Sequence, residues 1–297
     1  MAGAGLGCLL LAACGGGLVD PLANPAGGAS TRASEAVVVG SSAATESTVL
    51  AELYAQAITA RGVEAVTKLN TGSREVYLRA LQEGSISAVP EDTGNLLLSF
   101  DPSTTATTAE EVEQALPAAL PSGLTLGNPS PAANQDVYVV AKAYSDATGV
   151  RSLEDLKKVA ADVVLGGPPD LESRAYGPGG LAEVYGAQVK QFKPDDSADD
   201  RARDLDDGSI QLGEFLSTEV PAPGYVVLAD PQAMILPQNV VPLYRADVAA
   251  DARVTAAVDA VQQALTTEEL GALNAQVDVG SGVSEVARGW LRNEGLG

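Results

Sequence analysis

The sequence predicts an α/β protein built as two lobes with a ligand cleft between them. Strand-like and helix-like segments alternate from residue 35 onward, an order that favours sheets covered by helices. About 260 residues follow residue 34, enough for two lobes with a substantial core. Residues 240–297 begin as an apolar strand and continue as helices, which we interpret as a return to the first lobe. Two crossings between the lobes would then border the cleft.

Composition divides the chain into four segments. Residues 1–14 are an apolar leader, and residues 15–34 are rich in Gly, Ala, Pro and Ser without the periodicity of a folded element. We expect residues 35–133 together with 240–297 to form lobe 1, and residues 134–239 to form lobe 2. The second segment would be a flexible tether between the leader and the lobes.

The leader, MAGAGLGCLLLAAC, is uncharged and ends in the box Leu-Ala-Ala-Cys, whose last residue is Cys14. It resembles a bacterial lipoprotein signal peptide, in which this cysteine is lipidated and becomes the new amino terminus. The apolar run is too short to span a bilayer. The alternative is a buried apolar helix, which the three glycines that follow would end. We expect an extracytoplasmic protein held at the cell membrane by lipid on Cys14 alone.

The net charge of −21 and the missing residue types argue against several function classes. Nucleic acid and anionic lipid need Lys and Arg to neutralise phosphates, so neither is an expected partner. The chain has no histidine, and Cys8 and Cys14 both lie in the leader, which removes Cys/His and Ser/His/Asp catalysis and the usual zinc ligands. We expect no cofactor, no metal and no enzyme activity. An acid/base pair of Glu91 with Asp92 stays open as the alternative.

Lobe 1 begins with an alternation of strands and helices. Residues 37–39 are β-branched and indicate a strand that ends at Gly40, and a polar turn follows over residues 41–46. Thr45 is expected to cap the next helix, whose apolar residues recur at spacings of three and four. A second strand is predicted over residues 63–69. This succession predicts a parallel sheet with its loops gathered at one edge.

The third strand of this unit leads into the most promising polar stretch. Residues 85–89 alternate as a strand does, and Pro90 is expected to end it because proline has no N–H for the ladder. Ligands in open α/β sheets bind beyond the carboxyl ends of strands, so the residues that follow would line a crevice. The alternative is a solvated turn. The residues concerned are Glu91, Asp92, Thr93 and Asn95.

Capping patterns place two further helices of lobe 1. Thr108 with Glu111, and Thr266 with Glu269, have the spacing of a capping box, in which two side chains satisfy backbone N–H groups at a helix start. Pro117 is expected to end the first of these helices, because its ring clashes with the preceding turn and it has no N–H to continue the ladder.

Lobe 2 is expected to repeat the alternation, from a strand over residues 137–141 to a strand over residues 225–229. A glycine- and proline-rich loop over residues 166–180 holds one lone cation, Arg174. Residues 195–207 are strongly acidic, and we expect them to form a solvated face.

Seven stretches, in order along the chain, resemble a known family. They are VVVGSSAATE, LNTGSREVYLRAL, PEDTGN, GGPPDLESRAYGPGGLAEVYG, FLSTE, PQNVVPL and LNAQVDVGSGVSEVARGWLRNEGL. The chain resembles the glycine betaine/choline type (OpuAC/ProX-like) substrate-binding proteins of ABC importers. The resemblance implies a type II periplasmic-binding-protein fold, a Venus flytrap that closes on a small solute. It also implies delivery to a membrane permease driven by a cytoplasmic ATPase. We expect the protein to act as a monomer.

The resemblance also implies where the cage of aromatic ligand residues would fall. Relatives commonly have PEYTG where this chain has PEDTG, so Asp92 stands at an expected tyrosine. The aromatic in the first strand of lobe 2 falls on Asp136 or Val137. The third aromatic position falls on Phe215 or Leu216. Fewer aromatic faces weaken a trimethylammonium site, because such faces bind quaternary ammonium through cation–π attraction.

Polar positions of the family site fall on further residues. Gln238 occupies the fourth cage position, and Arg174 matches the arginine that binds the betaine carboxylate in relatives. Ser42 stands where lysine is common, and Asn95 where a polar contact is expected. Ser41 and Ser42 are candidates for ligand contact with ordinary turn residues as the alternative, and the same alternative applies to Gln238.

The expected pocket is therefore more polar than a betaine cage. We expect weak binding of glycine betaine and tighter binding of a hydroxylated or amine-bearing solute that Arg174 can also engage. Should glycine betaine bind well, other aromatics such as Tyr138 or Tyr176 would supply the cage. The alternative function is a ligand-sensing surface lipoprotein with no role in transport.

Overall fold

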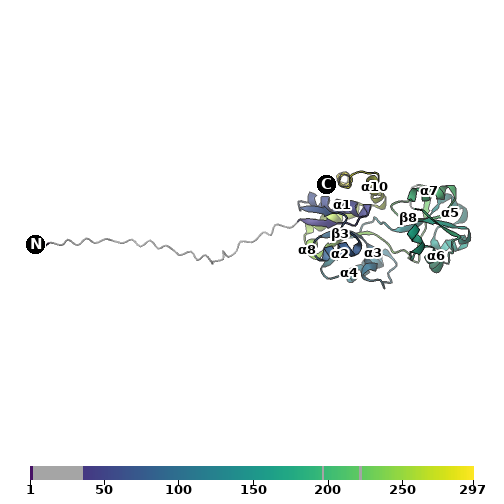
Figure 1. Cartoon of the computed structure of the whole chain (residues 1–297), viewed down its shortest axis with the longest axis horizontal. Coiled ribbons are helices and arrows are strands. Elements are labelled where there is room, and N and C mark those ends of the chain that lie inside the picture. The colour runs from purple at the N-terminus through teal and green to yellow at the C-terminus, as the bar shows by residue number, and fades with distance from the viewer. Residues whose placement is uncertain (3–35, 196, 221–222) are drawn as a thin grey trace. The chain divides into compact units, whose positions relative to one another are not determined.

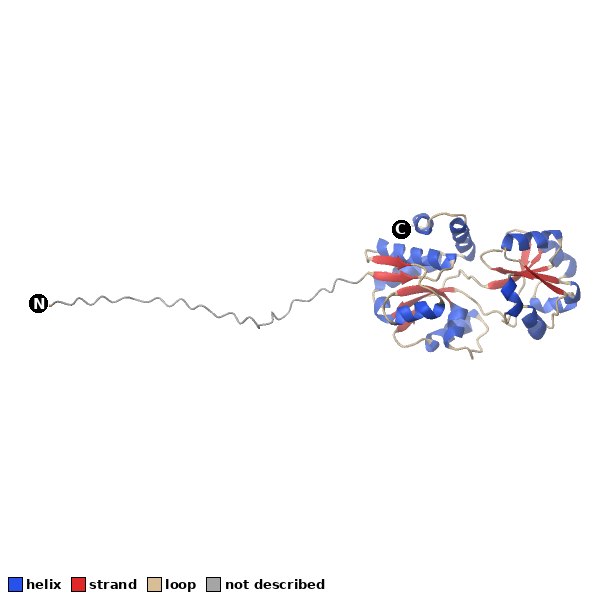
Figure 2. Ribbon diagram, in the orientation of Figure 1, coloured by secondary structure: helices blue, strands red, loops and turns tan. Residues whose placement is uncertain are grey.

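The computed structural model describes residues 1–2, 36–195, 197–220 and 223–297. Residues Ala36–Gly297 form one compact unit that contains two five-stranded sheets flanked by helices (Figures 1 and 2). The expected α/β class is confirmed. The expected tether and lipidation site lie outside the described residues.

The first sheet has the strand order β2-β1-β3-β10-β4, and we call the part built on it lobe 1. β1 is parallel to β2 and to β3, as predicted, but β10 is antiparallel to both β3 and β4. The parallel arrangement predicted for the first three strands is confirmed, but the complete sheet is mixed, because the returning chain inserts an antiparallel strand between two strands of its first passage. The strands are β1 (Val37–Gly40), β2 (Ala65–Lys68), β3 (Ala88–Asp92), β4 (Leu124–Leu126) and β10 (Val240–Arg245).

β3 continues through Pro90 to Asp92, so the prediction that Pro90 ends this strand is wrong. Pro90 lies opposite Pro242 of β10 in the antiparallel register. Neither proline has an N–H, and the pair therefore fits a ladder position where opposite residues exchange no hydrogen bond. Helix α3 (Thr93–Phe100) follows at once, where a turn was expected.

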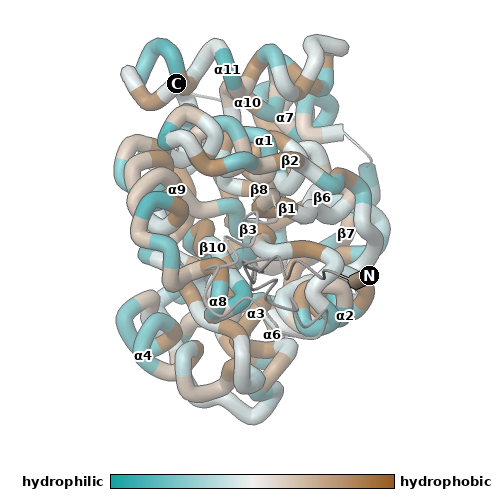
Figure 3. Tube along the Cα trace, turned by 90° about the vertical axis from the view of Figure 1, so that its left-hand side faces the viewer, coloured by the Kyte–Doolittle hydropathy of each residue, from teal (hydrophilic) through white to brown (hydrophobic). Residues whose placement is uncertain are grey.

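Helix α1 (Thr45–Ala60) is the central helix of lobe 1. Ten of its 16 residues are buried. It packs on α9 (Ala252–Ala264), α10 (Thr267–Asp278) and α11 (Val283–Asn293), so the carboxyl-terminal tail completes the core that α1 begins. Figure 3 shows hydrophilic and hydrophobic residues alternating along helices such as α9. The other helices of this lobe are α2 (Arg74–Gln82), α4 (Ala109–Ala119) and α8 (Ala246–Ala249).

The second sheet has the strand order β7-β6-β8-β5-β9, and we call the part built on it lobe 2. β6 is parallel to β7 and β8, whereas β5 is antiparallel to β8 and β9. The strands are β5 (Asp136–Ala141), β6 (Val164–Gly167), β7 (Gln191–Pro194), β8 (Leu212–Leu216) and β9 (Tyr225–Val227). The α-helices are α5 (Lys142–Thr148), α6 (Pro178–Tyr185) and α7 (Ala198–Asp207), and 3₁₀-helices span Leu153–Lys158, Ala160–Asp162 and Pro169–Ser173.

Both predicted capping boxes are confirmed. Thr108 with Glu111 starts α4, and Thr266 with Glu269 starts α10, each with both reciprocal hydrogen bonds. Pro117 does not end α4, which continues to Ala119. The proline lies in the last turn, where little helix remains to be disrupted.

Thr45 does not cap α1 as predicted. The N-cap is Ala44, which makes no side-chain capping bond. The Thr45 hydroxyl instead donates to Oδ1 of Asp278, at 2.8 Å. This bond links the start of α1 to the end of α10. Thr45 therefore makes a tertiary hydrogen bond in place of the expected capping bond within its own helix.

The acidic run over residues 195–207 is not wholly solvated, contrary to the prediction. Arg201 of α7 is 4% exposed, and its guanidinium lies 2.8 Å from the Asp195 carboxylate. It also donates to the backbone carbonyl of Glu214 and lies over the ring of Phe215, 4.9 Å from the centroid. The Arg201 side chain of this run is therefore buried in lobe 2, together with the carboxylate of Asp195.

The two crossings between the lobes lie side by side. Ala133 and Asn239 form an isolated antiparallel bridge. The backbone N–H of Asn134 donates to the carbonyl of Gln238 at 3.2 Å, and the N–H of Gln238 donates to Oε1 of Gln135 at 3.2 Å. Each crossing thus holds the other in place.

Candidate functional site

The carboxyl end of β3 carries two carboxylates in different surroundings. The buried Glu91 carboxylate accepts hydrogen bonds from Nε and Nη2 of Arg74 at 3.0 to 3.2 Å. Burial, and then the charge of Glu91, raise the pKa of Asp92 to about 7. Arg74 already holds the Glu91 carboxylate in an ion pair, which counts against an acid/base pair of these two residues. Asp92 is the carboxylate of the two that is open to a new partner.

Gln238 and Asn95 meet beside Asp92. Oε1 of Gln238 accepts from the backbone N–H of Asn95 at 2.9 Å, and Gln238 is 5% exposed. A Cβ on Gly94 would lie 2.6 Å from the carbonyl oxygen of Pro237, so glycine permits this close approach. Gln238 therefore anchors the first turn of α3 to the second crossing, while the Asn95 side chain is exposed.

Glu46, in the first turn of α1, belongs to the same neighbourhood. Its Oε2 is buried and has no hydrogen-bond partner among the described residues. Burial, and then the charge of Asp92, raise the pKa of Glu46 to about 8, and the amides of Asn274 and Asn134 act in the opposite direction. Sequence reasoning missed this site residue, because an acidic residue in a first helical turn is common and the helix dipole explains it.

A second polar group lies at the start of β5, in lobe 2. Nη1 of Arg174 is 3.4 Å from Oδ1 of Asp136, and Nη2 is 2.5 Å from Oδ2 of Asp170. The Tyr176 hydroxyl donates to Oδ2 of Asp136 at 2.8 Å, and the Tyr138 hydroxyl donates to the Tyr176 carbonyl. Asp136 and Arg174, both predicted site residues, are therefore in contact, and two carboxylates already match the charge of Arg174.

Glu214 of β8 is a further member of this second group. It is 3% exposed, and burial, followed by its hydrogen bond to Asp136 and the charge of Asp136, raises its pKa to about 9. The raised pKa favours the protonated form of Glu214 beside Asp136. Asp136 itself receives hydrogen bonds from two side chains of its own lobe, Arg174 and Tyr176.

The strand register places the two residues of each alignment choice on opposite faces of the sheet. Asp136 pairs with Leu216 across the β5–β8 ladder, and Val137 pairs with Phe215. Phe215 is completely buried and Val137 is 7% exposed, both in the core of lobe 2. Alternation along a strand places Asp136 and Leu216 on the other face. Phe215 is therefore a core residue, and its interpretation as a ligand contact is not supported.

Ser41 and Ser42 form local hydrogen bonds after β1. Ser41 is fully buried, and its hydroxyl donates to the Ser42 carbonyl at 2.8 Å and accepts from the Asn70 N–H at 3.1 Å. The Ser42 hydroxyl accepts from the Ala44 N–H at 3.2 Å. These bonds join the turns after β1 and β2 and favour the turn-residue alternative.

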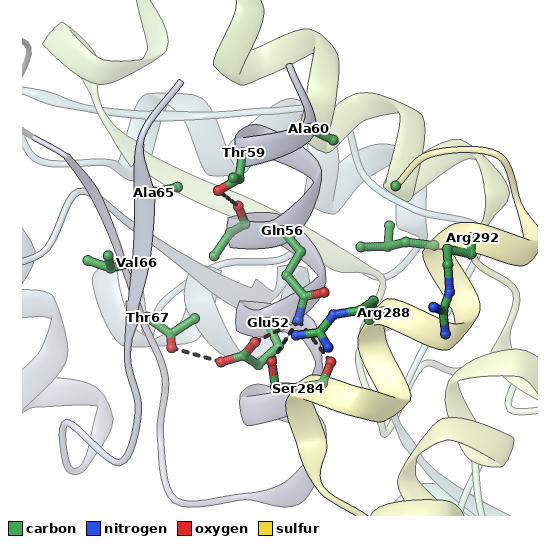
Figure 4. A pocket seen from close by; sticks show the side chains of 13 residues that line it. Glu52, Gln56, Thr59, Ala60, Ala65, Val66, Thr67, Ser284, Arg288 and Arg292 are labelled. Carbon is green, nitrogen blue, oxygen red and sulfur yellow. Dashed lines mark hydrogen bonds between the residues drawn. The ribbon is translucent and has the colours of Figure 1, made fainter. Parts of the chain in front are cut away.

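A pocket of about 760 Å³ lies between α1, β2 and α11 and shares no lining residue with either polar group. Figure 4 shows Glu52, Gln56 and Ser284 pointing toward one another inside it. Glu52 accepts from Thr67 and from Gln56, each at 2.8 Å, and Gln56 donates to Oγ of Ser284 at 3.0 Å. Because these groups already satisfy one another, we place the candidate ligand site at the strand ends.

Comparison with known proteins identifies the family. The model of the substrate-binding domain of ABC-type glycine betaine transport systems matches residues 35–293. The chain belongs to this family. Members are extracytoplasmic solute-binding proteins of ABC transporters, not enzymes. Among the described residues, no helix is both long enough and apolar enough to span a bilayer.

Solved structures similar to this member of the family share its fold. A glycine betaine/carnitine/choline ABC transporter protein has a TM-score of 0.78 at 17% identity, covering 88% of this chain and 99% of that one. Apo YehZ from Escherichia coli has 0.72 at 22% identity, covering 89% and 100%. Lactococcal OpuAC, closed on glycine betaine, has 0.54 at 13% identity, covering 86% and 95%. No curated protein matches in sequence. The expected type II binding-protein fold is confirmed.

Proposed function

We propose that this protein captures a small polar solute outside the cytoplasm and delivers it to the permease of an ABC importer, which a cytoplasmic ATPase drives. The family match over residues 35–293 carries the proposal. The fold supports it, because closing two lobes on a ligand is an established way to couple a ligand to a partner. The polar groups at the strand ends of both lobes would then face the solute.

The proposed ligand residues are Asp92 and Asn95 in lobe 1 and Asp136 and Arg174 in lobe 2. Tyr176 is the aromatic that accompanies them, but the Arg174 guanidinium lies over its ring, 5.6 Å from the centroid. A trimethylammonium group would have to displace this cation to reach that face. Glycine betaine is therefore expected to bind weakly, and a hydroxylated or amine-bearing solute more tightly.

A thermal-shift screen of the mature chain tests solute capture. Compatible solutes, polyols and aromatic glycosides are added one at a time, and at least one polar solute should raise the melting temperature more than glycine betaine does. A ligand at 100 times its Kd adds about 2.7 kcal/mol of stability, which such a screen detects readily. No shift with any solute at millimolar concentration would contradict the proposal.

We also propose that the mature protein is a monomer anchored through lipid on Cys14. The Leu-Ala-Ala-Cys box and the glycine-rich segment after it support the anchor. Membrane fractionation compares wild type with Cys14→Ser, and only the wild type should be recovered with the membrane. Soluble wild-type protein with an unmodified Cys14 would contradict the anchor.

A further inference from the structure

Two buried hydrogen-bond acceptors near the start of α1 have no donor among the described residues. They are Oε2 of Glu46 and Oδ1 of Asn274, which lies on α10. The two residues are neighbours: burial raises the pKa of Glu46, and hydrogen bonds from the amides of Asn274 and Asn134 to its carboxyl lower it, while Oε2 is the carboxyl oxygen left without a partner. Asp92 belongs to the same group, since its charge acts on Glu46. Buried polar atoms are nearly always hydrogen-bonded, so an unpaired pair of acceptors needs an explanation.

We propose that Glu46, Asp92 and Asn274 bind the protonated amine or guanidinium group of the solute through its N–H donors. This inference rests on the proposed function and specifies the chemistry of its solute. A primary or secondary ammonium brings at least two N–H donors, one for each unpaired acceptor. It also brings the positive charge that two neighbouring carboxylates attract, and charge-assisted bonds of this kind are the strong ones.

Other occupants fit this group less well. A trimethylammonium group has the charge but no N–H, so it would leave both acceptors unpaired. A hydroxyl group donates one hydrogen bond and brings no charge. A metal ion needs several converging ligands, and within the described residues no three acidic side chains lie close enough to form such a site.

The surroundings of Glu46 are acidic apart from one matched arginine. Glu91 lies next to Asp92, but its charge is balanced by the ion pair with Arg74 at 3.0 Å. Asp278 lies beside the start of α1 through its bond to Thr45. Tyr54 is fully buried, and its pKa is raised by burial and then by neighbouring charges. The charge of Asp92 acts on Glu46, and that of Glu46 acts on Tyr54. Glu91 and Arg74 act on Asp92, and Asp278 is bonded to Thr45, the residue before Glu46.

These surroundings give cation binding a measurable signature. With pKa values raised to about 8 for Glu46 and about 7 for Asp92, the empty group holds protons near neutral pH. A bound cation favours the ionised carboxylates and lowers their pKa values. Binding of an ammonium solute should therefore release protons to the buffer, which a purely structural role of Glu46 would not produce.

Two matched solute series test the inference by calorimetry on the mature chain. Glycine, sarcosine, dimethylglycine and glycine betaine lose N–H donors one by one at constant charge, and ethanolamine and choline repeat the extremes without a carboxylate. We expect sarcosine to bind at least about tenfold more tightly than glycine betaine, and ethanolamine to bind at least about tenfold more tightly than choline. Titrations at pH 7.5 in phosphate and in Tris, which differ in ionisation enthalpy, should show proton release.

Substitutions test which residues cause the preference for N–H donors and the proton release. Glu46→Gln keeps the size of the side chain and should bring both affinity ratios close to one and reduce proton release. Asn274→Ala removes the second acceptor and should lower the ratios partly. Glu113→Gln, an exposed residue of α4, is the matched control and should behave as wild type.

The possible failures are distinguishable. The inference would be overturned if glycine betaine and choline bound at least as tightly as sarcosine and ethanolamine, and if Glu46→Gln left these affinity ratios unchanged. The proposal of solute capture would still stand. Ratios that persist in Glu46→Gln would also overturn the assignment to this group. A thermal-shift screen with no binding solute at all would instead contradict the proposed function on which the inference rests.

Discussion

Asp136 in lobe 2 and Glu46 in lobe 1 are carboxylates with different hydrogen-bond surroundings. In lobe 2, Asp136 receives hydrogen bonds from Tyr176 and Arg174. In lobe 1, Oε2 of Glu46 receives none from the described residues. Acidity alone therefore does not mark a ligand site in this protein. What separates Asp136 from Glu46 is whether the protein already supplies hydrogen-bond donors to the carboxylate. The contrast concerns these two residues, because Oδ2 of Asp195 in lobe 2 is also buried without a partner among the described residues.

The largest effect is expected where a donor is removed from lobe 2. Arg201→Ala would leave the buried Asp195 without the cation that holds it, and breaking a buried ion pair in this way costs about 3–5 kcal/mol of unfolding free energy. Arg203→Ala is the control: that arginine lies on the same helix with 74% of its side chain exposed, and it should cost less than about 1 kcal/mol. Urea unfolding measures both. Equal, small losses would show that the ion pair between Arg201 and Asp195 does not stabilise lobe 2.

The next largest effect is a pH dependence in lobe 1. The pKa of Glu46 is raised from 4.5 to about 8 in the folded protein, so the folded state holds a proton that the unfolded state has lost between these values. This group therefore favours folding at low pH and loses that contribution as pH rises through about 8. Relative to Glu46→Gln, the ligand-free wild type should lose stability between pH 5 and 8. Parallel melting curves of the two proteins across this range would contradict an unsatisfied Glu46.

The smallest effect concerns Arg174, which is already paired with carboxylates of lobe 2. A solute carboxylate would compete with Asp170 and Asp136 for Arg174, whose side chain is 39% exposed. Arg174→Ala should therefore weaken sarcosine binding only about tenfold and leave ethanolamine binding unchanged. Arg151→Ala, at another exposed pair, serves as control. Calorimetry that shows equal losses for both solutes would remove Arg174 from carboxylate binding.

Features that depend on local spacing were predictable from the sequence. The alternation of strands and helices and both capping boxes follow from residues within a few positions of one another. The direction of β10 and the passage of β3 through Pro90 depend on a partner strand far along the chain, and local patterns do not contain it. Thr45 shows the same limit, because a distant aspartate replaced its predicted capping role.

The residues of the candidate site differ in the same way in whether the sequence could predict them. Asp92, Asp136 and Arg174 follow strand ends or a single loop, so motif positions in the sequence could indicate them. Glu46 acquires its character from Asp92 and Asn274, which come from two other parts of the chain. Its unpaired oxygen is a property of the packed structure, and no spacing in the sequence predicts it.

The position of β10 has a consequence for the order of folding. β10 lies between β3 and β4, whereas β5 to β9 come from one uninterrupted stretch of chain. Lobe 2 can therefore assemble as soon as its own residues are available, but the first sheet stays in two pieces until the chain has passed through lobe 2 and returned. Pairing between such distant segments carries a loop-closure cost and slows folding. Although lobe 1 begins first along the chain, a strand made after all of those in lobe 2 determines when it can close.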